Sequence, residues 1–124
     1  MGGFGFTSYQ STGATTTAFE ALQLARDIAA RRWAAGDEDN EVLGILQKND
    51  VEQAAEKAVT RAEAERLMNH LLGTPAPGER YVVFKLDEIP PYANHYGDVA
   101  GAIPVAEHEG GPVVAYLLFG IGND

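Results

Sequence analysis

The residue types best suited to recognising a ligand gather in the segment 87–98. This segment contains Tyr92, Asn94, His95 and Tyr96. Tyrosine rings can stack on a flat ligand or anchor a partner with little loss of entropy, and asparagine and histidine side chains can read hydrogen-bonding edges. A histidine oriented by Asp87 or Asp98 could also serve acid–base catalysis. The structural alternative is a loop stiffened by its two prolines, with tyrosines that cover the edge of the core.

A second candidate site is the segment 13–17, where three threonines precede a predicted helix. Thr15, Thr16 and Thr17 would lie at the helix N-terminus, where unpaired N–H groups and the helix dipole favour an anion such as phosphate. Arg26, on the same helix, is close enough to its start to approach a bound ligand. The more common roles are helix capping for the threonines and a surface ion pair for Arg26.

Other chemistries lack the residue patterns that they need. The histidines, His70, His95 and His108, are too far apart in sequence to form a local metal-ligand pair. The chain has no cysteine, which excludes disulfides, thiolate metal sites and a cysteine nucleophile. We therefore expect no metal and no cofactor, and an enzyme that uses His95 is the least supported of the functions considered.

The charge balance is strongly acidic. The chain carries 9 Lys and Arg residues against 18 Asp and Glu residues, a formal net charge of -9. Direct binding to nucleic acid is therefore not expected, because it requires neutralisation of phosphates by cations. A basic protein surface is a more suitable partner, since the charge would speed encounter and select partners. The candidate contacts are Asp37, Glu38, Asp39, Glu41, Asp50, Glu52 and Glu56, although such runs are usually solvated surface.

Length and composition predict a single folded domain over 1–124. The 124 residues are 45% hydrophobic and 22% charged, close to the averages for folded domains. No stretch approaches the roughly 18 continuous apolar residues of a membrane span, and the first residues lack the pattern of a secretory signal. We expect a cytoplasmic protein that does not bind membranes.

The helix that would position the threonines has the clearest signals. Thr17 and Glu20 have the spacing of a capping box, and Gly36 is a suitable residue to follow the last turn. The apolar residues expected to share its buried face are Phe19, Leu22, Ala25, Ala29 and Trp33. A second capping-box spacing predicts another helix over 60–72, and 51–59 is a weaker helix candidate.

The remaining segments predict an α+β domain. Strands are expected over 3–9, 42–46, 81–86, 99–105 and 113–119, with a linker over 74–78. The last two strands are expected to form a hairpin. The result is a mostly antiparallel sheet of four or five strands with two or three helices on one face. The apolar C-terminal strand, with Leu117, Leu118 and Phe119, further predicts a homo-oligomer formed through an uncovered sheet edge or face.

Three short segments resemble those of a set of small, uncharacterised phage and archaeal-virus proteins. Residues 44–48 (GILQK) resemble a G-x-I-x-x-K strand, and residues 96–103 (YGDVAGAI) and 116–120 (YLLFG) resemble W-G-x-A-G-x-I and Y-L-F-F-G-W strands. The chain departs from this pattern at Tyr96, which replaces the tryptophan, in one extra residue, and at Ile121. The resemblance implies a viral source and a role in blocking host defence, and it carries over no catalytic residue.

Two functions follow from these features. The first is a non-catalytic protein that sequesters a small nucleotide-like ligand in a cavity shared by 87–98 and 13–17. The alternative is an acidic inhibitor that binds a basic surface of a host protein.

Overall fold

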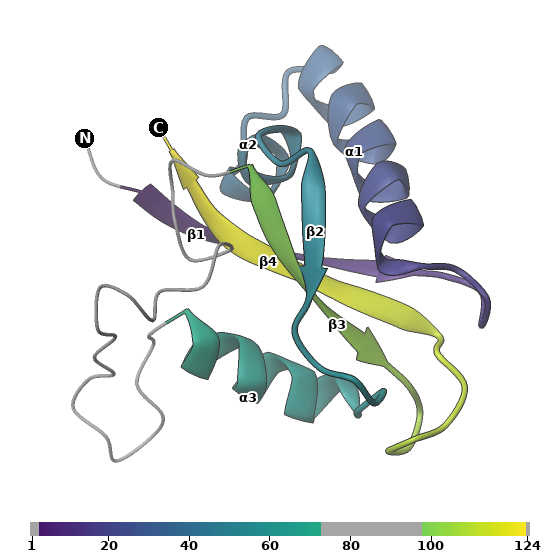
Figure 1. The fold of residues 1–124 in the computed structure, drawn as a ribbon. Helices are drawn as coiled ribbons and strands as arrows, with labels where there is room; N and C mark the ends of the chain where they lie inside the picture. The colour runs from purple at the N-terminus through teal and green to yellow at the C-terminus, as the bar shows by residue number, and fades with distance from the viewer. Residues whose placement is uncertain (1–2, 73–97, 124) are drawn as a thin grey trace.

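The computed structural model describes residues 3–72 and 98–123, which form a four-stranded sheet with three helices (Figure 1). The elements are β1 (Gly3–Ser11), α1 (Ala18–Ala34), α2 (Asn40–Leu46), β2 (Asp50–Gln53), α3 (Arg61–Leu71), β3 (Val99–Val105) and β4 (Ala115–Asn123). The strand order is β1-β4-β3-β2, with β4 antiparallel to both neighbours and β2 parallel to β3. The predicted α+β class, the mostly antiparallel sheet and the C-terminal hairpin are confirmed.

Helices α1 and α2 share one face of the sheet, which fits the predicted two helices on one face, and α3 covers the opposite face. Alternate residues of β3 and β4 point to opposite faces. On the face under α1 and α2, the buried residues of these strands are Ala100, Ala102, Tyr116 and Leu118. On the face under α3 they are Ile103, Val105, Ala115, Leu117 and Phe119. Because the two strands are apolar on both faces, each face needs its own cover.

Helix α1 begins where predicted, and three of the five residues predicted to be buried, Leu22, Ala25 and Ala29, are buried. Thr17 is the N-cap, and its capping box with Glu20 is complete. The residues that pack on the sheet are Ala18, Ala21, Leu22, Ala25 and Ala29. Phe19 and Trp33, predicted to be buried, are 47% and 44% exposed, because they lie at the border of this mostly alanine stripe. No helix within residues 3–72 and 98–123 is long and apolar enough to cross a membrane.

Two segments between α1 and α3 differ from their predicted structures. Residues 42–46 belong to helix α2 and not to a strand; Val42 and Ile45, three residues apart, share its buried face. In α2, Gly44 lies against the ring of Phe6 on β1. The weaker helix prediction at 51–59 is also wrong, because Val51 pairs with β3 and packs into the core under α1.

The later elements follow the sequence more closely. The predicted helix over 60–72 is α3, and the Thr60 hydroxyl accepts from the backbone N–H of Glu63 at 3.4 Å. The predicted strand over 113–119 is β4, shifted to begin at Ala115 and end at Asn123. Strand β4 lies between β1 and β3, so its apolar residues are buried in the sheet and do not form an uncovered edge. The predicted linker over 74–78 and strand over 81–86 lie outside the described residues.

Candidate functional site

The predicted anion site at the start of α1 is occupied by capping interactions. The Thr17 hydroxyl accepts from the Glu20 N–H, and the Thr17 N–H donates to Glu20 Oε1, each at 3.1 Å. The Thr16 hydroxyl accepts from the Gly13 N–H at 3.2 Å, and Thr15 is exposed. The Glu20 carboxylate also adds negative charge where a phosphate would sit. The capping role, the common alternative for these threonines, is therefore the one that Thr17 fills.

Loss of this cap has a measurable consequence. We expect Thr17→Ala to lower the free energy of unfolding by about 1 kcal/mol, because the Glu20 N–H loses its acceptor. Denaturant unfolding followed by circular dichroism measures this change. The matched control is Thr15→Ala, at an exposed position two residues earlier, which should change the free energy by less than about 0.5 kcal/mol. Equal effects of the two variants would contradict the capping role.

Arg26 ties helix α1 to the connection between α2 and β2. One of its guanidinium nitrogens donates to the carbonyl oxygen of Lys48 and to Oδ1 of Asn49. The Lys48 side chain is itself fully buried. Burial lowers the pKa of Lys48, and the nearby Asp98 carboxylate offsets part of that effect. Arg26 thus has a structural role within the chain.

The predicted cavity shared by the segment 87–98 and the threonines depends on residues outside the described ranges. Tyr92, Asn94, His95 and Tyr96 lie outside the described residues, and Asp98 is the first residue after that gap. The Asp98 carbonyl accepts from the N–H groups of Asn49 and Asp50, beside the start of β3. The Thr12 N–H donates to the Val114 carbonyl, beyond the C-terminal end of β3. The length of this seven-residue strand, about 20 Å, therefore separates Asp98 from Thr12.

The other two histidines stand apart from one another. His70 lies in the last turn of α3 and is exposed, and His108 is exposed in the turn between β3 and β4. Within the described ranges, no three histidine or acidic side chains are grouped so that they could hold a metal ion.

Three hollows in the described surface lie beside β1, an edge strand of the sheet, and another of about 340 Å³ lies on α3, lined by Glu63, Arg66, Leu67 and His70. One of the β1 recesses, about 390 Å³, is lined by Gly5, Phe6, Thr7, Asn40, Glu41, Met68, Asn69 and Leu72. A neighbouring recess of about 250 Å³ also includes Tyr9, Arg61 and Glu65. A third, of about 110 Å³ on the α1 side, includes Ser8, Ile28 and Arg32. These three β1 recesses share Glu41. Sequence patterns identified β1 as a strand, but not as the edge beside which these residues meet.

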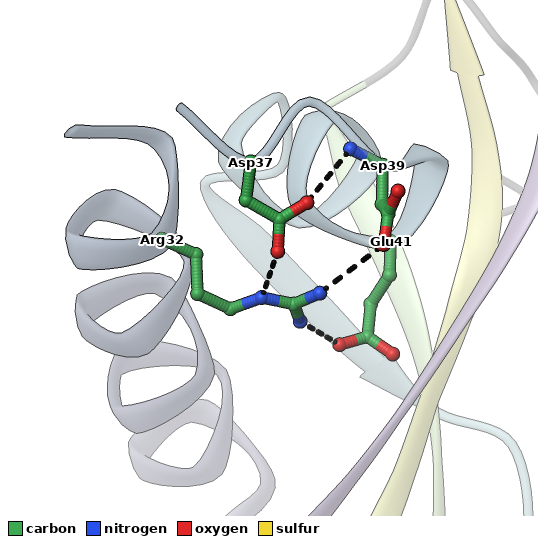
Figure 2. A network of polar contacts seen from close by, with 4 residues as sticks. All are labelled: Arg32, Asp37, Asp39 and Glu41. Carbon is green, nitrogen blue, oxygen red and sulfur yellow. Dashed lines mark hydrogen bonds and ion pairs between the residues drawn. The ribbon is translucent and has the colours of Figure 1, made fainter. Parts of the chain in front are cut away.

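The most extensive polar network of the described residues lies where α1 turns into α2 (Figure 2). Arg32 Nε lies 2.7 Å from an Asp37 carboxylate oxygen, and its terminal nitrogens lie 2.5 Å from Glu41 and 3.5 Å from Asp39. The hydrogen bond from Arg32 lowers the pKa of Asp37, and the Asp39 N–H contributes to that effect. The hydrogen bonds to Asp37 and Glu41 raise the pKa of Arg32. Three of the predicted acidic contact residues are thus turned toward a single arginine.

The network makes stability depend on acidity in a defined direction. Because the pKa of Asp37 is lowered on folding, its contribution to stability is present above its ordinary pKa of 3.8 and is lost as the pH falls through the folded value. Asp37→Asn should therefore be less stable than wild type at neutral pH, and the difference should shrink below pH 3.8. Urea unfolding across a pH series measures it, with Glu38→Gln as the exposed control. A difference that grows on acidification would contradict this account.

The basic side chains of the described region are largely engaged within the molecule. Arg32, Arg61 and Arg66 form ion pairs with carboxylates, Arg26 bonds to a carbonyl, and Lys48 is buried. Arg31 and Lys57 are exposed. Exposed carboxylates that form no ion pair with other described residues include Glu20, Asp27, Glu38, Asp50, Glu52, Glu56, Glu107 and Glu109. The outer surface is therefore dominated by negative charge.

Comparison of the chain with models of protein families, with curated proteins and with solved structures finds no match.

Proposed function

We propose that this chain is a non-catalytic binding protein whose acidic surface recognises a basic surface on a partner protein. The observation that carries the proposal is the asymmetry of its surface charges. Most of the described arginines form ion pairs or bond to backbone carbonyls within the chain, whereas many carboxylates are exposed and unpaired. A field of one sign speeds the approach of an oppositely charged partner and disfavours neutral or acidic ones.

The three β1 recesses suit a nucleotide-like ligand less well. Glu41 lines all three β1 recesses, so a phosphate placed there would meet a carboxylate. The arginines that border the recesses, Arg32 and Arg61, are already paired with acidic side chains. A ligand would have to break those pairs before either guanidinium could bind it bidentately. Sequestration of a nucleotide-like ligand stays a prediction that depends on Tyr92, Asn94, His95 and Tyr96.

Four of the predicted acidic contacts are the best placed to meet a partner. Asp50 and Glu52 project from the same side of β2, and Glu38 and Glu56 are also exposed. Asp37, Asp39 and Glu41 are held by Arg32, so a partner would have to compete for them. The first group therefore provides the contact residues of this proposal.

The cellular setting belongs to the same proposal. The short segments that resemble small viral proteins suggest that the basic partner is a host protein and that binding inhibits it. Such an encounter would take place in the cytoplasm of the host cell.

Thermal unfolding separates the two functions directly. We expect an arginine-rich peptide to raise the melting temperature at low salt and to lose this effect at high salt, because exposed charges are screened. A panel of mono-, di- and cyclic nucleotides should leave it unchanged, and native mass spectrometry of the purified protein should find no retained small molecule. A retained nucleotide, or a shift caused by nucleotides alone, would contradict the proposal.

A further inference from the structure

The two outer strands of the described sheet differ sharply in how they are protected. Strand β2 has four residues, two of which are the carboxylates Asp50 and Glu52. Strand β1 has nine residues with neither charge nor proline, and its pairing with β4 continues without a bulge from Gly3 to Ser11. Charges, prolines, bulges and short length are the usual means by which an edge strand avoids pairing with another chain. Strand β1 uses none of them.

We infer that a second copy of this chain pairs antiparallel with the outer edge of β1. An isologous contact needs a surface that complements itself under two-fold rotation. An antiparallel pair of identical strands meets this condition, because every pairing of one residue with another is repeated in reverse. The proposal goes beyond the acidic surface, which it leaves exposed at the far edge of the sheet.

The charges around β1 favour a second copy over a basic partner. The charged side chains that line the β1 recesses are Arg32, Arg61, Glu41 and Glu65. They are paired within the chain, Arg32 with Glu41 and Arg61 with Glu65. The recess linings therefore carry two charges of each sign, in a protein whose net charge is -9. Two copies can approach here without setting uncompensated carboxylates against each other.

The side chains of β1 identify a specific register, centred on Thr7. In that register Thr7 faces Thr7 of the second copy, and Gly5 faces Tyr9. Thr7 and Gly5 are exposed, and a Cβ placed on Gly5 would have no atom of residues 3–72 or 98–123 within 4 Å. Tyr9 is half-buried, with the Arg61 guanidinium 3.9 Å from the centre of its ring. The space above Gly5 is therefore open to an aromatic ring from the second copy.

The chain already uses this kind of pair within its own sheet. Gly101 faces Phe119 and Gly122 faces Phe4 across neighbouring strands. In each pair the phenylalanine ring covers the glycine so closely that a Cβ on the glycine would clash with it. Gly5 has the same residue type in the same sheet, but no ring of the described residues covers it. The second copy's Tyr9 would complete the pattern.

The helices leave room for this arrangement. Helix α2 packs on both β1 and β4, so its axis lies over that strand pair. With about 4.8 Å between strands, the two α2 helices would lie roughly 10 Å apart across the two-fold axis, an ordinary packing distance. On the other face, α3 packs on β3 and β4 and leaves Gly5 and Thr7 exposed.

Cysteine cross-linking tests the register, because the chain has no cysteine of its own. Thr7→Cys places one thiol opposite its symmetry mate, at a Cα separation of about 4.5–5.5 Å that a disulfide can span. We expect this variant to form a covalent dimer under mild oxidation at least about tenfold faster than Glu52→Cys, the exposed control on β2. Sedimentation velocity of the unmodified protein should show a dimer that dissociates on dilution.

Charge substitutions at the same position provide the second arm. Thr7→Lys and Thr7→Glu should each raise the dimer dissociation constant at least about tenfold, because like charges would face each other. An equimolar mixture of the two should restore the dimer as a Lys–Glu pair, whereas Glu52→Lys should leave dimerisation unchanged. A wild-type monomer at every concentration overturns the proposal, as would occur if the chain's own residues cover β1. A dimer that Thr7→Lys leaves intact, or equal cross-linking rates, also overturns it.

Discussion

Replacing Phe119 by alanine is expected to lower the free energy of unfolding by about 3–5 kcal/mol, the largest single effect that we predict. The Phe119 ring is fully buried between the sheet and α3. The ring covers Gly101 on β3 so closely that a Cβ there would clash with the Cζ atom and lie 2.6 and 2.8 Å from the two Cε atoms. Alanine would leave a cavity that neither the glycine nor the adjacent Leu117 can fill. Chemical denaturation monitored by circular dichroism gives the difference.

The matched control is Phe19→Ala. The Phe19 side chain lies on α1 and is 47% exposed. Its removal should change the free energy of unfolding by less than about 0.5 kcal/mol, as expected of surface positions. Comparable losses in the two variants would mean that burial of Phe119 under α3 does not describe the folded protein.

Gly44→Ala is expected to destabilise the protein by about 1–3 kcal/mol, although alanine is the better helix former. Gly44 lies in the middle of α2, where the substitution would ordinarily stabilise a helix by about 1 kcal/mol. Here a new Cβ would overlap the ring of Phe6 and lie 2.8 Å from the Phe6 Cβ. Because the Phe6 Cβ is bonded directly to the backbone of β1, it cannot move away from the new Cβ without shifting the strand. Equilibrium unfolding measures the sign of the change.

Gly13→Ala is the control for that substitution. A Cβ on Gly13 would have the Thr16 hydroxyl as its nearest neighbour, at an ordinary contact distance of 3.7 Å. Its effect should stay within about 0.5 kcal/mol. A stabilised Gly44→Ala variant would show that α2 does not pack on Phe6, and the position of α2 over β1 would then have to be abandoned.

The parts of the fold that sequence patterns predict correctly depend on short-range interactions. Both capping-box spacings, at Thr17 and at Thr60, mark real helix starts because the cap and its partner lie within a single turn. Residues 42–46 fit a strand pattern but form part of α2, because a short apolar run fits either state. Gly44 is the informative residue there: its small size allows a close approach to Phe6, a contact that depends on residues far apart in sequence.

Local sequence patterns do not predict the order of the strands, because that order depends on pairing between segments far apart in the chain. An apolar strand near the C-terminus could pair on one side or on both, and β4 is a central strand because it pairs with β1 on one side and with β3 on the other.

The roles of the candidate binding residues also depend on contacts between segments far apart in sequence. The threonines were correctly placed at a helix start, but only the structure shows that capping occupies them and that Arg26 bonds to the α2–β2 connection. The β1 recesses could not be found without knowing which strand lies at the edge.

The binding of a fluorescent arginine-rich peptide, titrated across a salt series, tests the proposed acidic function most directly. It should be measured on wild type and on two double variants that remove the same charge, Asp50→Asn with Glu52→Gln, and Glu107→Gln with Glu109→Gln. We predict that wild-type affinity falls at least about tenfold from low to high salt, and that the β2 variant loses several times more affinity than the variant in the β3–β4 turn. An affinity that does not change with salt concentration, or equal losses of affinity in the two variants, would contradict a contact surface centred on β2.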